Sequence, residues 1–351
     1  MPEYPPRRVG RAGSRRRARW ALLGLVLLLL VSLCLSFVLG RYDLSVRDTL
    51  LLFREGLFSL PSGLDSGESR IFFRLRLPRV LAAAIVGGGL ALSGCVYQTS
   101  FRNPMVSPDL LGATHGAGLG AALGLLMDMD NMGVQIMAFL FGLLAVGGTY
   151  LMSSLLGDKS QQSFSLILTG IVMSALFQAG ISLIKYVGDP YTKLPAITFW
   201  LMGSLSTVVP SSLPLLVLPL LIGGLPLLLM RWKLNLLSLS DEEAMSLGVN
   251  TNRLRALIIV CATLITSSVV SVSGIIGWVG LLIPHLARMI VGSDCRTLVP
   301  ACFLLGSSYL LLVDDVARSV SAMDIPLGIL TAAVGAPFFF WLMYRERKTR
   351  R

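Results

Sequence analysis

Long apolar runs separated by short polar segments make up most of this chain. Ten runs are predicted to be helices that cross a membrane: 20–39, 80–98, 112–127, 133–156, 164–187, 212–230, 255–273, 278–291, 299–313 and 327–344. A helical crossing needs about 20 apolar residues, so the short runs 278–291 and 299–313 are predicted to be partial or tilted crossings. The pattern predicts an all-α polytopic membrane protein with ten transmembrane helices.

Basic residues gather at the two ends of the chain. Residues 1–19 carry seven arginines against one glutamate, and residues 345–351 carry five basic residues. Because basic segments stay on the cytoplasmic side of a membrane, both ends are predicted to be cytoplasmic. The chain then divides into a basic arm (1–19), a single transmembrane domain (20–344) and a basic tail (345–351). We interpret the arm as an orientation signal, with binding to anionic lipid as the alternative.

The segment 40–79 is predicted to be an extracytoplasmic loop. It holds seven arginines and five acidic residues. This excess of arginine opposes the orientation rule, so we expect these arginines to have a task outside the membrane.

One polar stretch in the second half of the chain is unusually well delimited. Ser240 and Glu243 have the spacing of a capping box, and Asp241 and Glu242 would fall in the first turn, where the helix dipole favours negative charge. Gly248 can end a helix in the left-handed conformation. The spacing predicts a helix of about two turns over Asp241–Leu247. It is either a capped connector between membrane helices or a docking helix for a soluble partner.

Glycines recur every four residues in the third predicted span, at Gly112, Gly116, Gly120 and Gly124. Glycines at this spacing line one face of a helix and let a second backbone approach closely. Gly87, Gly88, Gly89 and Gly94 in the second span are interpreted in the same way. The glycines therefore predict close helix packing and no nucleotide loop.

Composition supports the membrane class and excludes several others. Hydrophobic residues make up 54% of the chain and charged residues 14%, whereas soluble domains average about 25% charged residues. The net charge of +11 lies at the chain ends and in short loops, which disfavours nucleic-acid binding. The five cysteines have no metal or disulfide spacing, and no catalytic motif is present. We expect no metal, cofactor or catalytic site in this chain.

The interiors of the predicted spans are almost free of acidic residues. A carrier driven by an ion gradient normally needs a buried acid, so the energy for any transport is expected to enter from a partner. This favours the docking helix. A secondary transporter is the alternative function, and an intramembrane enzyme or redox protein is a third.

Several motifs, taken together and in order, resemble the permease subunits of ATP-binding-cassette importers for iron-siderophores, haem and cobalamin. The resemblance covers roughly residues 70–344 and is carried by these segments: Arg76-Leu-Pro-Arg79, Ser93-Gly-Cys-Val-Tyr-Gln98, Arg102-Asn-Pro-Met-Val-Ser-Pro-Asp-Leu-Leu-Gly112, Trp200-Leu-Met-Gly-Ser204, the stretch through Gly248-Val-Asn250, Gly274-Ile-Ile-Gly-Trp-Val-Gly-Leu-Leu-Ile-Pro-His-Leu-Ala-Arg288, Asp314-Asp-Val-Ala-Arg318, Pro326-Leu-Gly328 and Gly335-Ala-Pro-Phe338. Asp324-Ile-Pro326 departs from the usual Glu-Leu-Pro of the family.

The resemblance implies a multi-pass permease of the cell (inner) membrane that pairs with a second permease copy. It implies cytoplasmic ATPase subunits, which bind ATP and Mg²⁺, and an extracytoplasmic substrate-binding protein. The family's coupling helix would correspond to Ser240, Asp241, Glu242, Glu243, Ala244, Leu247 and Gly248. The arginines that meet the binding protein would correspond to Arg76, Arg79 and Arg318. Arg318 also lies four residues after Asp314, so an ion pair on one helix face is expected there.

The substrate class follows from the resemblance. It implies a metal chelate, with ferric siderophore ahead of haem and cobalamin, carried by alternating access at a dimer interface. Four large polar or aromatic residues are candidates to line the path: Gln98, Gln178, Tyr186 and Trp200.

Overall fold

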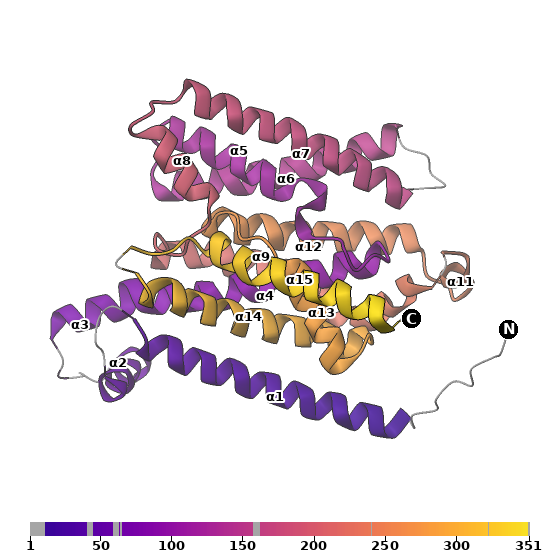
Figure 1. Ribbon diagram of the computed structural model, residues 1–351, viewed down its shortest axis with the longest axis horizontal. Helices are drawn as coiled ribbons and strands as arrows, with labels where there is room; N and C mark the ends of the chain where they lie inside the picture. The colour runs from indigo at the N-terminus through magenta and orange to yellow at the C-terminus, as the bar shows by residue number, and fades with distance from the viewer. Residues whose placement is uncertain are drawn as a thin grey trace.

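The computed structural model describes residues 11–40, 45–58, 63, 65–156, 162–239, 241–321 and 323–349. Within these residues the chain is built from helices joined by short connections, and no strand occurs (Figure 1). This agrees with the all-α fold that the apolar runs predict.

Each of the ten predicted spans coincides with a helix. These helices are α1 (Arg11–Val38), α4 (Leu77–Ser100), α5 (Ala113–Leu126), α6 (Asn131–Leu156), α7 (Gln162–Val187), α9 (Leu213–Leu229), α12 (Thr251–Ser273), α13 (Val279–Val291), α14 (Cys295–Ser319) and α15 (Leu327–Thr349). Among the described residues, seven helical segments are long and apolar enough to cross a membrane, and α5, α13 and part of α15 are shorter apolar helices. The chain is therefore a multi-pass membrane protein.

The structure corrects the prediction for 299–313. This run is not a partial crossing, because α14 extends over 25 residues and is among the long apolar segments. The apolar run appeared short because Asp314, Asp315 and Arg318 lie inside the helix and are buried there. Helix α13 has only 13 residues, fewer than the about 20 of a full crossing, so the companion prediction stays a prediction.

The predicted extracytoplasmic loop 40–79 is also largely helical. It contains α2 (Val46–Phe58) and α3 (Ser66–Ile71), and α3 continues through one π-helical turn, η1 (Phe72–Arg76), into α4. These helices mix charged and apolar residues, so they contain no long apolar run that would predict them. As a result, Arg76 and Arg79 lie on a continuous helical segment and not on a loop.

The helices pack in layers around two central members, α4 and α12. Figure 1 shows α5, α6, α7 and α8 (Lys193–Leu201) on one side of these two and α1 on the other. The most apolar 18-residue stretch of Ser66–Ser100, the segment that includes α4, is 83% buried. The corresponding stretch of α7 is 17% buried. Large apolar side chains on α1 and α7 consequently cover the outside of the bundle, as lipid-facing helices require.

Glycines allow the central helices to touch through their backbones. A Cβ atom on Gly94 of α4 would lie 1.8 Å from the carbonyl oxygen of Gly280 in α13. On α5, a Cβ atom on Gly116 or Gly120 would lie about 2.5 Å or 2.4 Å from a carbonyl oxygen of α6. The close packing predicted for the glycine repeats is confirmed at these positions.

The bundle has two polar ends, named here after Arg79 and Arg102. The Arg79 end carries α2, α3 and the connections α7–α8 and α14–α15, on the left of Figure 1. The Arg102 end lies opposite and carries the start of α1, the end of α15 and the short helices η5 (Asn235–Ser238) and α11 (Asp241–Ser246).

Candidate functional site

The short helix predicted in the polar stretch is present as α11. It begins at Asp241, and Gly248 ends it with φ of +79°. The Gly248 N–H donates to the Met245 carbonyl at 2.9 Å, and the Val249 N–H donates to the Ala244 carbonyl at 3.1 Å. These bonds close the helix as the sequence predicts. Ser240 and the side chain of Asp241 lie outside the described residues.

The side chains of α11 divide sharply between the bundle and the outside. Ala244 is fully buried, whereas Met245 and Leu247 are 56% and 62% exposed. Glu242 and Glu243 are also exposed. The helix thus buries Ala244 against the bundle, and Met245 and the adjacent Leu247 lie exposed beside two acidic residues. Such a surface fits a protein partner better than bulk solvent.

A set of polar contacts, here called the Arg102 joint, connects this region to the central helices. The Arg102 Nε donates to the carbonyl of Leu237 in η5 at 2.7 Å. Arg102 itself has φ of +51°, which is unusual for a residue with a side chain. The Arg288 Nη1 of α13 donates to the Gln98 Oε1 of α4 at 2.6 Å. Together these bonds tie α4 to η5 and to α13.

A cavity of about 240 Å³ opens beside the Arg102 joint. Its described lining includes Gln98, Arg102, Ser238 and Arg288. Gln98 also donates from Nε2 to the carbonyls of Gly280 and Leu281, at 3.4 and 3.3 Å. Gln98, a candidate for the substrate path, is buried at the Arg102 end and lines this cavity, and its place in a path stays a prediction.

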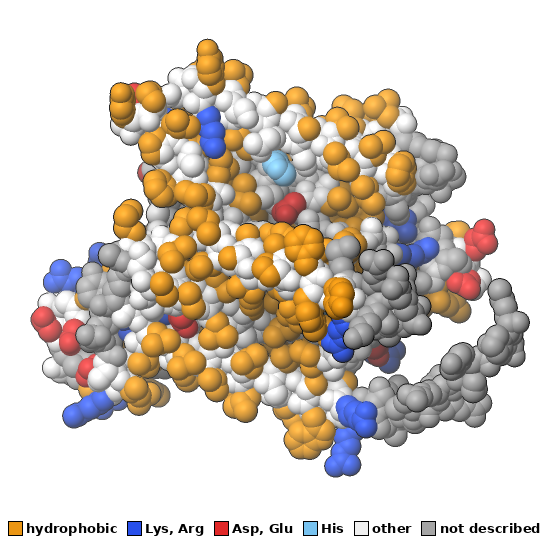
Figure 2. All heavy atoms as spheres, viewed as in Figure 1, with side chains coloured by type: hydrophobic (Ala, Val, Ile, Leu, Met, Phe, Trp, Pro, Cys, Tyr) orange, Lys and Arg blue, Asp and Glu red, His pale blue; other side chains and the backbone are white. Residues whose placement is uncertain are grey.

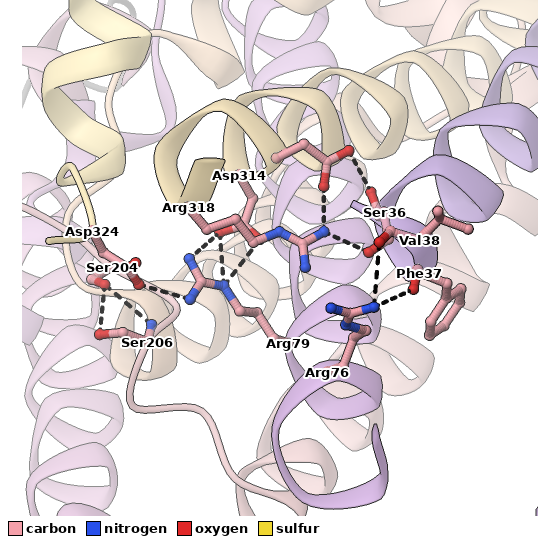
Figure 3. Close-up of polar contacts among 11 residues, drawn as sticks. Ser36, Phe37, Val38, Arg76, Arg79, Ser204, Ser206, Asp314, Arg318 and Asp324 are labelled. Carbon is pink, nitrogen blue, oxygen red and sulfur yellow. Dashed lines mark hydrogen bonds and ion pairs between the residues drawn. The ribbon is translucent and has the colours of Figure 1, made fainter. Parts of the chain in front are cut away.

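At the opposite end, Arg79 is held between two carboxylates. Its Nε and Nη2 atoms lie 3.0 and 2.8 Å from the Asp314 Oδ1, and its Nη1 lies 2.7 Å from the Asp324 Oδ2 (Figure 3). Asp314 belongs to α14 and is buried, whereas Asp324 belongs to the α14–α15 connection. One guanidinium therefore joins α4, α14 and a connecting segment.

Arg318 and Arg76 complete the group that Figure 3 shows around the end of α1. The Arg318 Nη2 bonds to Asp315 and donates to the Ser36 carbonyl at 2.6 Å. The Arg76 Nη1 donates to the Phe37 carbonyl at 2.7 Å. The expected pair on one helix face is confirmed, with the Arg318 Nε 3.6 Å from the Asp314 Oδ2. We call this set the Arg79 cluster: Arg76, Arg79, Asp314, Asp315, Arg318 and Asp324.

The Arg79 cluster changes the interpretation of the three arginines as docking residues. Arg76 and Arg318 are 5% and 6% exposed, so most of each side chain is inside the bundle. Even so, all three arginines line one cavity of about 260 Å³ at this end. Docking through them stays a prediction. The sequence did not indicate the pairing of Arg79 with Asp324, although it marked Asp324 as a departure from the family pattern.

The remaining path candidates are not brought together. Gln178 and Tyr186 are exposed on α7, and Tyr186 is 87% exposed. Trp200 lines a cavity of about 720 Å³ with Ser204, Ser206 and Asp324 among its other described lining residues. This cavity has a mostly apolar lining with a few serine and threonine side chains, and it lies next to the Arg79 cluster, because Asp324 borders both cavities. It was not predicted from the sequence.

Metal and thiol chemistry find little support in the described part of the chain. No group of three or more His, Cys, Asp or Glu side chains there is arranged to hold a metal ion. The five cysteines are free, and four of them are buried. They pack as small apolar side chains.

Much of the face shown in Figure 2 is apolar, with charged side chains mainly toward its ends. This distribution fits a bundle surrounded by lipid or by a second apolar protein surface.

Comparison with known proteins gives a consistent assignment. The model of the family described as "FecCD transport family" matches residues 28–345. The chain is 42% identical over 327 residues to the molybdate import system permease protein MolB of Haemophilus influenzae, covering 93% of this chain and 96% of that protein. It is 43% identical over 282 residues to a probable iron chelatin transport system permease protein of Helicobacter pylori, covering 80% and 85%.

A solved structure has the same fold. It is titled "An inward-facing conformation of a putative metal-chelate type ABC transporter", and it matches with a TM-score of 0.82 and 42% identity. The match covers 92% of this chain and 98% of that one.

Proposed function

The chain belongs to the FecCD transport family and is a permease of the ABC importers for metal chelates, and from this membership we propose how it works. The subunit pairs with a second copy of itself, with two cytoplasmic ATPase subunits and with an extracytoplasmic binding protein. It holds no nucleotide and has no catalytic site, and ATP with Mg²⁺ is bound by the ATPase. Transport proceeds by alternating access at the interface between the two permease copies.

The exposed surface of α11 is the observation that carries this mechanism. Its two outward apolar side chains, Met245 and Leu247, fit a groove in the ATPase, and a single buried residue, Ala244, fastens it to the bundle. A helix of six residues is too short to be stable alone in water, so a partner would complete its packing. We therefore assign α11, with the cap at Ser240 and the stop at Gly248, as the coupling helix.

The sidedness follows from this assignment. The Arg102 end, with α11, the start of α1 and the end of α15, is cytoplasmic, and the Arg79 end is extracytoplasmic. The binding protein docks at the Arg79 end, where Arg76, Arg79 and Arg318 line a cavity. Charge pairs of this kind mainly accelerate and orient an encounter. The basic arm 1–19 acts as an orientation signal.

A ferric siderophore is the proposed substrate, with haem and cobalamin as the next chelates. Support comes from the similarity to an iron chelatin permease and to a transporter of the metal-chelate type. A second candidate is an oxyanion such as molybdate. The 42% identity to a molybdate permease over nearly the whole chain favours it.

Uptake into proteoliposomes that contain the complete importer tests these proposals. The vesicles hold ATP inside, the loaded binding protein is added outside, and labelled ferric siderophore, haem, cobalamin and molybdate are compared. We expect ATP-dependent uptake of one chelate. Uptake of molybdate alone would transfer the assignment to the oxyanion, and uptake driven by an ion gradient without the ATPase would indicate a secondary transporter.

A further inference from the structure

An apolar groove of about 310 Å³ lies between α9 and α14, in the half of the bundle nearer the Arg102 end. Its α9 wall runs from Leu220 to Leu228, and its α14 wall runs from Val299 to Leu304. Both helices pack on α4, which contributes Leu92 to the lining. None of the described lining residues carries a polar side chain. The groove therefore offers apolar contact alone.

The groove opens to the outside of the bundle and is elongated along α9. Leu221 and Leu225 of its lining are 56% and 53% exposed. At 1.5 Å per residue, the stretch 220–228 is about 12 Å long. The opposite wall is firmly placed, because the Phe303 ring lies against the backbone of α4, where a Cβ atom on Gly88 would lie 2.6 Å from it. A narrow apolar groove of this kind fits an extended hydrocarbon chain and gives water no polar partner.

The α14 face that lines the groove continues into a basic residue. Arg296 lies in the first turn of α14, and Val299, Pro300 and Phe303 follow it by three, four and seven positions. Residues at this spacing share one face of a helix. The last three line the groove, and Arg296 is exposed. A guanidinium therefore stands on the same face, where the groove approaches the Arg102 end.

The α9 wall also leads to basic residues. Helix α10 (Arg231–Leu234) follows α9 and contains Arg231 and Lys233. Trp232 between them is 47% exposed, and the Lys233 Nζ lies 5.5 Å from the centre of its ring. Tryptophan is typical of the level at which membrane helices meet lipid headgroups. We call Arg231, Lys233 and Arg296 the basic rim.

Hydrogen bonds hold the two parts of the basic rim together. Asn235 follows α10, and its Nδ2 donates to the Asp294 Oδ1 at 2.8 Å. The Cys295 N–H, at the start of α14, donates to the Asn235 Oδ1 at 2.8 Å. Asp294 also accepts a bond from the Arg296 N–H at 3.0 Å. These bonds bring one carboxylate to three cations, so positive charge dominates where the groove ends.

We propose that the groove and the basic rim bind one anionic phospholipid, with an acyl chain between α9 and α14 and the phosphate at the rim. Lipid tails are about as apolar as leucine, so the groove supplies a shape for the chain and not a hydrophobic driving force. The rim supplies the preference for a charged headgroup. A second copy of the chain fits this face less well, because a symmetric contact would bring two basic rims together. The site depends on the membrane location of the chain and not on the proposed transport mechanism.

Photo-cross-linking locates the lipid. The full-length chain is placed in phosphatidylcholine nanodiscs with a trace of a probe lipid that carries a diazirine in its acyl chain, and labelled peptides are identified by mass spectrometry. The probe is either phosphatidylglycerol or phosphatidylcholine, and the ratio of their labelling is the enrichment. We expect the enrichment at 220–228 and 299–304 to exceed that at α1 at least about fivefold. Equal enrichment at the groove and at α1 would overturn the site, because α1 also has arginines at the same end.

Filling the groove tests its part in the site. A Cβ atom on Gly224 would lie 3.5 Å from Leu220 and 3.6 Å from Leu92, in ordinary contact, so Gly224→Leu places a side chain in the groove. Gly147→Leu on α6 is the control, since a Cβ atom there meets nothing within 4 Å. Gly224→Leu should abolish the enrichment and the rise in unfolding temperature that added phosphatidylglycerol gives in detergent. Gly147→Leu should keep both. Full enrichment in Gly224→Leu would contradict the proposal.

Neutralising the rim tests the headgroup contact. Arg231→Gln, Lys233→Gln and Arg296→Gln together should reduce the groove enrichment at least about tenfold and leave phosphatidylcholine labelling unchanged. The control removes three exposed arginines from the start of α1, with Arg16→Gln, Arg17→Gln and Arg19→Gln combined.

An equal loss in the control would assign the effect to general surface charge and overturn the site. Arg296→Gln alone, with an expected loss of about fivefold, decides the question if the triple variant does not fold. Inorganic phosphate added at constant ionic strength should leave the enrichment intact. Its loss there would assign the rim to a free anion and refute the lipid site.

Discussion

The two ends of this bundle use arginine in different ways. At the Arg79 end, Arg79 and Arg318 face carboxylates on α14 and on the connection after it. At the Arg102 end, the described contacts of Arg102 and Arg288 run to a backbone carbonyl and to an amide oxygen. The first arrangement is a buried ionic network, and the second is a joint made with neutral acceptors.

This difference indicates at which end the contacts cost less free energy to break. Removing one partner of a buried ion pair costs about 3–5 kcal/mol, because a charge is left without compensation. A hydrogen bond between a charged group and a neutral one contributes less, about 1.5–3 kcal/mol net. The described bonds of the Arg102 joint therefore contribute less to stability than the ion pairs of the Arg79 cluster. The Arg79 cluster holds its helices through buried ion pairs that are costly to break.

The strongest test of this contrast is Asp314→Ala. Asp314 is shared by Arg79 and Arg318, so its loss leaves two buried guanidinium groups with one carboxylate fewer. We expect stability to fall by about 3–5 kcal/mol, measured as thermal unfolding in detergent. Asp65→Ala is the control, since Asp65 is an exposed acid before α3 at the same end and its side chain makes no capping hydrogen bond. Equal shifts in the two variants would show that the network is not the source of rigidity.

A second test separates stability from coupling. Met245→Asp combined with Leu247→Asp places charge on the exposed apolar surface of α11. Uptake by the complete importer should fall at least about tenfold, as expected when hot-spot contacts are lost, while the unfolding temperature stays unchanged. Ser246→Asp adds a charge to the same helix and should preserve most uptake. Full activity of the double variant would remove α11 from the coupling path.

An intermediate effect is expected at the Arg102 joint. Gln98→Leu removes the acceptor of Arg288 and the donor to the Gly280 and Leu281 carbonyls. The free energy of unfolding should fall by about 1–3 kcal/mol, which is the cost of buried groups left without partners. This decrease is smaller than the one expected for Asp314→Ala. Thermal unfolding measures it, with Gln178→Leu on the exposed face of α7 as the control. A loss as large as that of Asp314→Ala would erase the contrast between the ends.

The smallest expected effect is a lowered pKa of the exposed Asp189. Hydrogen bonds from the Thr192 hydroxyl and N–H, and from the Tyr191 N–H, lower the pKa of Asp189. Because the folded state favours the ionised form, this stabilisation is present at neutral pH and is lost as the pH falls through the lowered pKa. Carboxyl NMR titration should give a pKa for Asp189 below the ordinary aspartate range. A pKa within that range would contradict the local bonding.

The sequence predicted the helices well because membrane spans leave a local signal. An uninterrupted apolar run is sufficient to predict a helix in lipid, and all ten such runs are helical. The polar helix α11 could also be predicted, since its stop at Gly248 is a local feature. Helices α2 and α3 were missed because they mix charge with apolar residues, as short surface helices do.

The pairing of the site residues could not be predicted in this way. Arg79 and Asp314 are 235 positions apart in the chain, and only the fold brings them together. The sequence did single out Gln98, Arg102 and Arg288 within motifs, but nothing local indicates that α4 and α13 meet there. Their contact depends on glycines that let two backbones touch.

That backbone contact gives α4 the geometry of a lever. Gly94 rests directly against Gly280 with no side chain between them, so the contact can act as a fulcrum. At 1.5 Å per residue, α4 extends about 22 Å from Gly94 to Arg79 and only about 9 Å to its last residue, Ser100. If α4 turns as a rigid rod, a displacement of 1 Å at the short arm becomes roughly 2.5 Å at the long arm. Mechanical advantage of this kind would turn a small movement at the Arg102 end into a larger one at the Arg79 end.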